Sequence, residues 1–295
     1  MDWRAIGLGL AFVAMWSSAF TSARIIVAYA PPFLALSVRF LASGLIALAI
    51  GWALGQGLPR GRAQWTAVAV FGLCQNALYL GLNFLALRSI DASVAVIVAS
   101  LLPLVVAGLA WATLGERLTA PAAAGLAAGL AGVLVIMTAR LGAGADPVGL
   151  ALCFGALLAL SVATLLVRGA SAGGDLWVIV GLQMLVGSAL LFPFALAFET
   201  WSVDWSAPLA LAFLYTILFP GLAATMIWFV LVRRIGATRA ATFHFLNPFF
   251  GVATAALILG EAVTARDLLG VAIIMAGILA VQLSRNPPPP PPPVE

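Results

Sequence analysis

The sequence has few charged residues, and every one of its basic residues is arginine. Only 8% of the residues are Asp, Glu, Lys or Arg, whereas 64% are hydrophobic. A soluble domain needs a charged surface, so this composition excludes one and is typical of an integral membrane protein. The arginines do not form a basic patch interleaved with aromatic residues, which argues against nucleic acid as a partner.

Cysteine, histidine and deeply placed acidic residues are scarce as well. Cys74 and Cys153 are the only cysteines, and they lie inside apolar runs without the spacing of a disulfide or a metal site. The chain has one histidine, and no Asp or Glu lies deep in an apolar run. An intramembrane enzyme needs a catalytic dyad or a metal cluster at membrane depth. We therefore expect no catalytic residue, no metal and no cofactor.

Apolar runs fill most of the chain. A bilayer core of about 30 Å requires roughly 20 helical residues, and ten runs meet this length. We expect an all-α integral membrane protein with ten transmembrane helices. The expected spans are residues 5–28, 32–54, 64–87, 92–114, 120–139, 147–168, 175–197, 207–232, 238–259 and 265–284.

The second half of the chain repeats the first at an offset of 145 residues. Residues 88–134 and 233–279 are identical at 17 of 47 positions, where chance gives roughly a tenth. We expect a first five-helix repeat in residues 1–143, a second in 144–285, and a proline-rich tail, 286–295, outside the fold. An odd number of spans inverts the second repeat. Inverted repeats are typical of secondary transporters that work by alternating access.

The arginines at the ends of the spans predict the orientation. With ten spans both termini share one side, and that side collects nine arginines against four on the other. The positive-inside rule therefore places both termini in the cytoplasm, and we expect a multi-pass protein of the inner (plasma) membrane.

The stretch Thr242–Glu261 places His244, Asn247 and Pro248 within an apolar span. Pro248 cannot donate to the carbonyl of His244, which we expect to be left free. At the offset of 145 residues Pro103 matches Pro248. Both prolines are therefore expected to break their helices beside a binding site.

Other polar and aromatic residues inside the spans complete the candidate cavity. Polar groups are costly in a membrane unless they face protein or water. Aromatic rings attract ammonium groups and stack on apolar side chains, while amides and hydroxyls bind either end of a zwitterion. The candidate substrate-binding residues are Trp16, Ser17, Tyr79, Asn83, Ser100, Thr225, Trp228, His244 and Asn247.

Two of the polar residues leave alternatives open. Arg39 is the one charge well inside a span, and it serves either as a structural charge or as the partner of a substrate carboxylate. His244 fixes a helix contact, binds the ligand or carries a proton. Because no carboxylate lies at membrane depth, we favour downhill, facilitated efflux, with proton exchange as the alternative.

Two patterns of small and polar residues predict helix faces. Gly72, Asn76, Tyr79 and Asn83 share one face. We expect the first two to pack against a helix and the last two to line the cavity. Gly125-x-x-x-Gly129 and Ala272-x-x-x-Ala276 are close-packing patterns, either inside the fold or between protomers.

With these features together, the chain resembles the EamA family of the drug/metabolite transporter superfamily, and most of all its branch of aromatic amino acid exporters. The matching segments are Trp16 with its small neighbours, Arg39-Phe40, Tyr79 to Leu87, Pro103 with Gly115 to Leu118, Ala237 to Ala240, Pro248 and Gly260-Glu261. The resemblance implies export of small neutral metabolites, chiefly amino acids, through a central cavity. A carrier of lipid precursors or sugar conjugates is the alternative in the same fold. The sequence leaves the oligomeric state open.

Overall fold

The computed structural model describes residues 3–90, 92–115, 118–138, 146–170, 175–259 and 264–283. All the regular structure of these residues is helical. In chain order the elements are α1 (Trp3–Tyr29), α2 (Pro32–Ala53), α3 (Arg62–Phe71), the π-helix η1 (Gly72–Leu80), α4 (Gly81–Ala86), α5 (Ala92–Ala99), α6 (Leu102–Leu114), α7 (Ala120–Thr138), α8 (Pro147–Ala170), α9 (Leu176–Phe198), α10 (Ala207–Thr216), the π-helix η2 (Ile217–Ala224), α11 (Thr225–Ile235), α12 (Ala237–Ala241), the 3-10 helix η3 (Thr242–Leu246), α13 (Asn247–Leu259) and α14 (Ala265–Leu283).

Many of these helices have the length and composition of membrane spans. Among the described residues, six helical segments are apolar and long enough to cross a bilayer: Trp3–Tyr29, Pro32–Ala53, Arg62–Ala86, Pro147–Leu166, Leu176–Phe198 and Ala207–Ile235. Three further apolar helices are shorter: Leu102–Leu114, Ala120–Val135 and Leu268–Val281. The protein is therefore all-helical with six strongly apolar spans. The expected total of ten transmembrane helices stays a prediction, because the helices at the other four expected spans are shorter or interrupted.

The boundaries of the helices recur at the offset seen in the sequence. α6 begins at Leu102 and α13 at Asn247, and both contain 13 residues. α7 and α14 begin at Ala120 and Ala265, and both contain 19 residues. The two π-helices also begin 145 residues apart, at Gly72 and Ile217. The irregular turns of the two halves therefore recur together with their regular helices.

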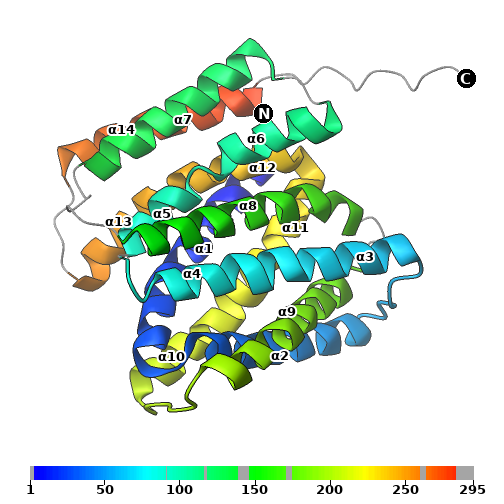
Figure 1. Ribbon diagram of the computed structural model, residues 1–295. Coiled ribbons are helices and arrows are strands. Elements are labelled where there is room, and N and C mark those ends of the chain that lie inside the picture. The colour runs from blue at the N-terminus through cyan, green and yellow to red at the C-terminus, as the bar shows by residue number, and fades with distance from the viewer. Residues whose placement is uncertain are drawn as a thin grey trace, which may run out of the picture.

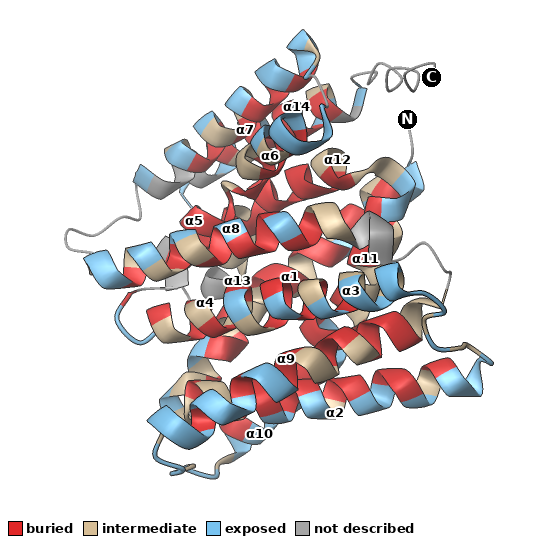
Figure 2. Ribbon diagram, turned by 45° about the vertical axis from the view of Figure 1, so that its right-hand side comes forward, coloured by how far each residue is buried: buried red, intermediate tan, exposed pale blue. Residues whose placement is uncertain are grey.

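Two helix pairs lie at opposite ends of the molecule, with α1 between them (Figure 1). One pair is α2 with α9, and the other is α7 with α14. Each pair joins elements far apart in the chain. α1 packs against α10, α11 and α13, and buried residues occur along its whole length (Figure 2). The centre of the molecule is therefore built around α1.

Glycines allow the backbones of both helix pairs to approach closely. A Cβ atom on Gly125 of α7 would lie 2.6 Å from the carbonyl oxygen of Gly277 on α14, and a Cβ on Gly277 would lie equally close to the Gly125 carbonyl. In the other pair, a Cβ on Gly44 of α2 would lie 3.0 Å from the Gly181 carbonyl oxygen of α9. Small residues at such contacts let membrane helices pack tightly. In both pairs the backbones of the two helices are therefore in close contact.

The close-packing patterns expected from the sequence divide between two environments. Gly125 faces α14, and a Cβ on Gly129 would meet the Phe245 ring at 2.4 Å, so this pattern packs inside the fold. Ala272 and Ala276 are exposed on the outside of α14. In α14 the close contact with α7 is instead made by Gly277.

The start of α2 is fixed by a carboxylate from the end of α9. The Glu199 side chain accepts hydrogen bonds from the backbone N–H groups of Phe33 (2.7 Å) and Leu34 (2.8 Å). The first N–H groups of a helix have no intrahelical partner, and an anion there also matches the helix dipole. Glu199 therefore ties the two helices of this pair together at the end where the chain enters α2.

Candidate functional site

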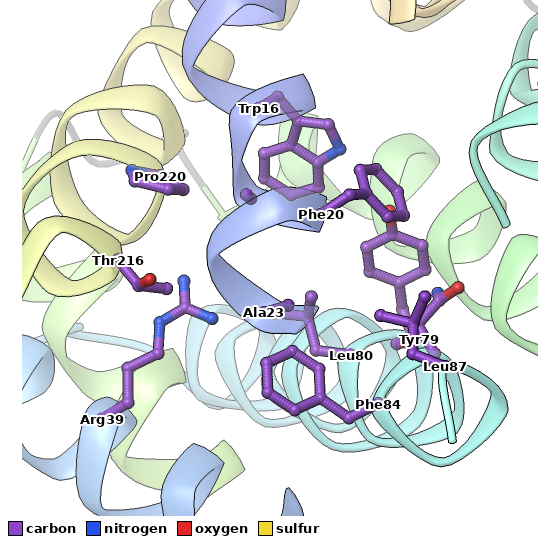
Figure 3. Close-up of a pocket in the computed structure, with 12 residues that line it drawn as sticks. Trp16, Phe20, Ala23, Arg39, Tyr79, Leu80, Phe84, Leu87, Thr216 and Pro220 are labelled. Atoms are coloured by element: carbon purple, nitrogen blue, oxygen red, sulfur yellow. The ribbon is translucent and has the colours of Figure 1, made fainter. Parts of the chain in front are cut away.

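A narrow cavity lies between α1, α2, η1 with α4, and the junction of α10 with η2 (Figure 3). Its volume is about 30 Å³, enough for roughly two water molecules. The lining residues are Trp16, Ala19, Phe20, Ala23, Arg39, Tyr79, Leu80, Asn83, Phe84, Leu87, Thr216 and Pro220. In this conformation the cavity is therefore too small for a molecule much larger than water.

The aromatic wall of the cavity comes from α1 and η1. The rings of Trp16 and Tyr79 lie nearly parallel, at 10°, with centroids 6.0 Å apart. Trp16, Phe20 and Ala23 step by four and three residues along α1, so they present one face to the cavity. This wall offers both flat rings and apolar edges to a ligand.

Asn83 lies one turn beyond Tyr79 and is the amide in the cavity wall. Its Nδ2 donates to the Tyr79 carbonyl oxygen at 2.8 Å, and its Oδ1 lies 3.7 Å from the sulfur of Cys153. The side chain is thus held by its own helix and by α8. A ligand that binds it competes only with the weak thiol contact.

The polar stripe of the third span divides as expected. A Cβ on Gly72 would lie 2.6 Å from the Gln183 carbonyl oxygen, and the Asn76 amide donates to both the backbone and the side-chain oxygen of Gln183. Both residues therefore pack against α9. Tyr79 and Asn83 line the cavity instead.

Arg39 supplies the positive charge of the cavity lining. The residue is only 4% exposed, and its guanidinium group points into the space enclosed by the lining side chains (Figure 3). Its Nε has no hydrogen-bond partner among the described residues. The centre of the guanidinium lies 5.2 Å from the Phe40 ring, a cation–π contact.

The wall opposite α1 contains a proline and a glycine in η2. Pro220 lacks the N–H that an α-helix requires, and the wider π-helix accommodates it. At Gly221 a Cβ would lie 2.8 Å from the Thr216 carbonyl oxygen, 3.2 Å from the Ser43 hydroxyl oxygen and 3.6 Å from Nη2 of Arg39. Only glycine therefore fits at this position beside the guanidinium, because a larger side chain would collide with the Thr216 carbonyl.

On the other side of Trp16 the structure closes into an aromatic cluster, which we define as Phe12, Trp16, Trp228 and His244. The Phe12 and Trp228 rings stack with centroids 4.8 Å apart. The His244 imidazole meets Phe12 and Trp228 at 5.2 Å and Trp16 at 6.0 Å, each edge to face. This cluster fills the space between α1, α11 and η3.

A chain of hydrogen bonds orients the imidazole. The Ser17 hydroxyl donates to Oδ1 of Asn247 at 3.0 Å, and Nδ2 of Asn247 lies 3.1 Å from Nδ1 of His244. With the amide in this orientation its N–H donates and Nδ1 accepts, which corresponds to a neutral imidazole with its hydrogen on Nε2. His244 is therefore held as a neutral ring inside the aromatic cluster.

The candidate residues from the sequence fall into three places. Trp16, Tyr79, Asn83 and Arg39 line the cavity. Ser17, Trp228, His244 and Asn247 belong to the aromatic cluster and its hydrogen bonds. Ser100 and Thr225 donate to carbonyl oxygens of their own helical segments, those of Val96 and Pro220. The structure thus brings the first four together in the cavity and the next four together in or beside the aromatic cluster, with Trp16 belonging to both groups, and it leaves the last two outside the cavity lining.

The two prolines lie where the helices are interrupted. α5 ends at Ala99 and α6 begins at Leu102, directly before Pro103. Pro248 follows η3 and stands at the second residue of α13. The expectation that Pro248 leaves the His244 carbonyl free is wrong, because the tighter 3-10 turn lets the Asn247 N–H donate to it.

Eight lining residues were not among the candidates from the sequence: Ala19, Phe20, Ala23, Leu80, Phe84, Leu87, Thr216 and Pro220. The two phenylalanines look like any lipid-facing residue in a chain with 17 of them. Thr216 stands four residues before Pro220, so both lie on one helix face. This spacing would have predicted that Thr216 lies near the same part of the cavity as Pro220.

Apolar helices around a buried cavity that is lined by rings, an amide and a cation are typical of a helical membrane protein. The chain belongs to the EamA-like transporter family, whose model matches residues 3–138 and again residues 147–283. It is therefore a membrane transporter and not an enzyme.

Two named relatives are similar along most of their length, and a third along about half. The uncharacterized transporter YvbV of Bacillus subtilis is 27% identical over 92% of this chain and 90% of its own. The uncharacterized inner membrane transporter YedA of Escherichia coli K12 is 26% identical over 95% of this chain and 90% of its own. The aromatic amino acid exporter YddG of Ancylobacter novellus is 33% identical over 46% of each chain.

A solved crystal structure shares the fold. It superposes with a TM-score of 0.78 over 96% of this chain and 98% of its own, at 24% sequence identity.

Proposed function

We propose that this transporter exports small neutral metabolites, chiefly amino acids including aromatic ones, by alternating access through the cavity beside Trp16. The observation that carries the proposal is the lining itself, where the stacked rings of Trp16 and Tyr79 face Arg39 and Asn83. Rings bind an ammonium group or an aromatic side chain, and a guanidinium binds a carboxylate. The name of the YddG relative, an aromatic amino acid exporter, supports the same class.

The proposed architecture is ten membrane crossings in two inverted repeats of five, 1–143 and 144–285, with both termini in the cytoplasm of the inner membrane. The recurrence of the helix boundaries and of both π-helices at one offset supports the repeat, and the arginine distribution supports the orientation.

The orientation is testable by cysteine labelling. Both natural cysteines are buried, so a single cysteine introduced at position 57 or 202 is the reactive thiol. In intact cells a membrane-impermeant maleimide should label position 202 and not position 57. The reverse pattern would place both termini outside.

We further propose that transport is facilitated rather than proton-coupled. Among the described residues, no carboxylate lines the cavity. His244 is enclosed by three rings and accepts from Asn247, which suits a fixed neutral ring better than a proton carrier. Ser17, Trp228, His244 and Asn247 therefore support the cavity wall from behind, through Trp16.

The deciding experiment is counterflow in proteoliposomes preloaded with a mixture of unlabelled neutral amino acids. Labelled L-phenylalanine should accumulate without any ion gradient, and empty liposomes supply the background. Accumulation that appears only with an imposed proton gradient would replace facilitation by proton exchange. No accumulation in either condition would move the substrate class to lipid precursors or sugar conjugates.

A further inference from the structure

The buried charge of Arg39 lacks a partner of opposite sign. The structure gives its guanidinium no hydrogen bond and no ion pair among the described residues, and its one recorded contact is a cation–π contact with the Phe40 ring at 5.2 Å. A guanidinium has five N–H donors, and a buried cation without an anion or water is costly in a membrane. An anionic ligand that enters the cavity would therefore be stabilised by the guanidinium.

The space open to such an anion is the cavity that Arg39 lines. The backbone of η2 passes close beside the guanidinium. The place of an absent Gly221 Cβ lies 3.6 Å from Nη2 of Arg39 and 3.2 Å from the Ser43 hydroxyl oxygen, but only 2.8 Å from the Thr216 carbonyl oxygen. Ser43 is also completely buried, and its hydroxyl likewise has no partner among the described residues. Arg39 and Ser43, one turn apart on α2, are thus two unpaired donors on one side of the helix, beside η2.

The remaining lining is apolar on the side away from Arg39. Phe20, Phe84 and Leu87 line the same cavity, and Figure 3 shows them across from the Arg39 side chain. A molecule with its negative end on Arg39 would therefore lay an apolar or aromatic group against these three side chains. Since no acidic side chain among the described residues lines the cavity, an ammonium group would meet only ring faces and the Asn83 amide.

We infer that Arg39 in the cavity wall, with Ser43 one turn further along α2, forms a carboxylate subsite that makes a carboxylate on an apolar or aromatic group the required feature of the substrate. This inference rests on the proposed function and sharpens it. A carboxylate matches the planar fork of a guanidinium in a two-point contact, and the Ser43 hydroxyl adds a third donor. The ammonium group is dispensable for binding, so deaminated acids are ligands and decarboxylated amines are not.

Two analogues of L-phenylalanine test the subsite: 3-phenylpropionate, which lacks the ammonium group, and 2-phenylethylamine, which lacks the carboxylate. In the counterflow assay, 3-phenylpropionate should compete within about tenfold of L-phenylalanine, whereas 2-phenylethylamine should be at least tenfold weaker. The factor follows from the strength of a charged hydrogen bond. Equal competition by both analogues, or stronger competition by the amine, would overturn the inference.

A binding assay separates failure of the subsite from failure of the proposed transport. Purified protein in detergent is heated with each analogue, because a ligand that binds the folded state raises the unfolding temperature. Stabilisation by 3-phenylpropionate and not by 2-phenylethylamine supports the subsite even when L-phenylalanine is not transported. No stabilisation by 3-phenylpropionate, together with no competition in transport, contradicts the subsite.

Variants of α2 assign the effect to the named side chains. Arg39→Gln should weaken 3-phenylpropionate binding roughly ten- to hundredfold, and Arg39→Lys less, since it keeps the charge and loses the fork. Ser43→Ala is the milder variant that tests the subsite when Arg39→Gln does not fold, with an expected loss of about threefold or more.

The matched control is Ser37→Ala on the same helix. Its hydroxyl is already bonded to Ser188 of α9, unlike the unpaired hydroxyl of Ser43, so 3-phenylpropionate should bind this variant as it binds the unaltered protein. Unchanged binding in both Arg39→Gln and Ser43→Ala would make the guanidinium a structural charge. Equal losses in Ser43→Ala and Ser37→Ala would attribute the effect to helix packing.

Discussion

The indole ring of Trp16 stacks on the phenol ring of Tyr79 and at the same time meets the edge of the His244 imidazole, with both centroid distances at 6.0 Å. One face of the indole therefore belongs to the cavity, and the other side of the residue belongs to the aromatic cluster. Any change in the cluster that shifts Trp16 also changes the shape of the cavity.

Replacing Trp16 tests this dual position. Trp16→Ala removes the stacked partner of Tyr79 and two further ring contacts, and we expect counterflow to fall by about tenfold because aromatic pairs contribute beyond their buried area. Trp111→Ala is the control, since this indole on α6 is 64% exposed. Transport that falls equally in both variants would assign the loss to expression or insertion.

Trp228 distinguishes support of the cavity wall from direct contact with substrate. This indole is 2% exposed, and its N–H has no partner among the described residues. Trp228→Ala should lower the free energy of unfolding by about 3–5 kcal/mol through the space it leaves. Trp228→Phe removes the unpaired N–H and keeps a ring, so it should retain both stability and counterflow. A stable Phe variant without counterflow would move Trp228 into the binding site.

His244→Gln tests the role of the imidazole. Oε1 of glutamine can accept from Asn247 as Nδ1 does now, so downhill counterflow should persist at about half the normal rate or more. The measurement compares counterflow with accumulation under an imposed proton gradient. If the substitution abolishes only a gradient-driven component, His244 carries protons.

Gly125→Ala tests the contact between α7 and α14. The added Cβ would lie 2.6 Å from the Gly277 carbonyl oxygen, and overpacking of this kind costs about 1–3 kcal/mol. The matched control is Gly108→Ala on α6, where a Cβ meets nothing within 4 Å. Thermal unfolding in detergent should show a loss for position 125 alone. Similar unfolding temperatures for both variants would show that the pair adjusts without strain.

Much of the helical framework was readable from the sequence, because apolar runs, turns and the 145-residue offset act locally along the chain. The third span is a clear case, since the division between Asn76, which packs on α9, and Tyr79, which lines the cavity, followed from spacing and polarity. The family was also recognisable from its motifs. The number of crossings was not settled this way, because apolar segments can be interrupted, as between α5 and α6 or by the 3-10 turn η3 before α13.

The site was only partly predictable, since it depends on contacts between distant segments. The hydrogen bond from Ser17 to Asn247 spans 230 residues, and no spacing rule connects the two. Nothing in the sequence distinguishes Phe84, which lines the cavity, from a phenylalanine that faces lipid. The prediction of a free His244 carbonyl assumed an α-helix before Pro248. The chain forms a 3-10 turn there, and the Asn247 N–H donates to that carbonyl.

The pairing of α2 with α9 has a consequence for synthesis. The two helices end at Ala53 and Phe198, so at about 5–20 residues per second the first waits on the order of ten seconds for its partner. During that time the Ser37 hydroxyl lacks Ser188, and the first turn of α2 lacks the Glu199 carboxylate. The newly inserted first half is therefore an incomplete intermediate that depends on the insertion machinery, lipid headgroups or water until the second half arrives.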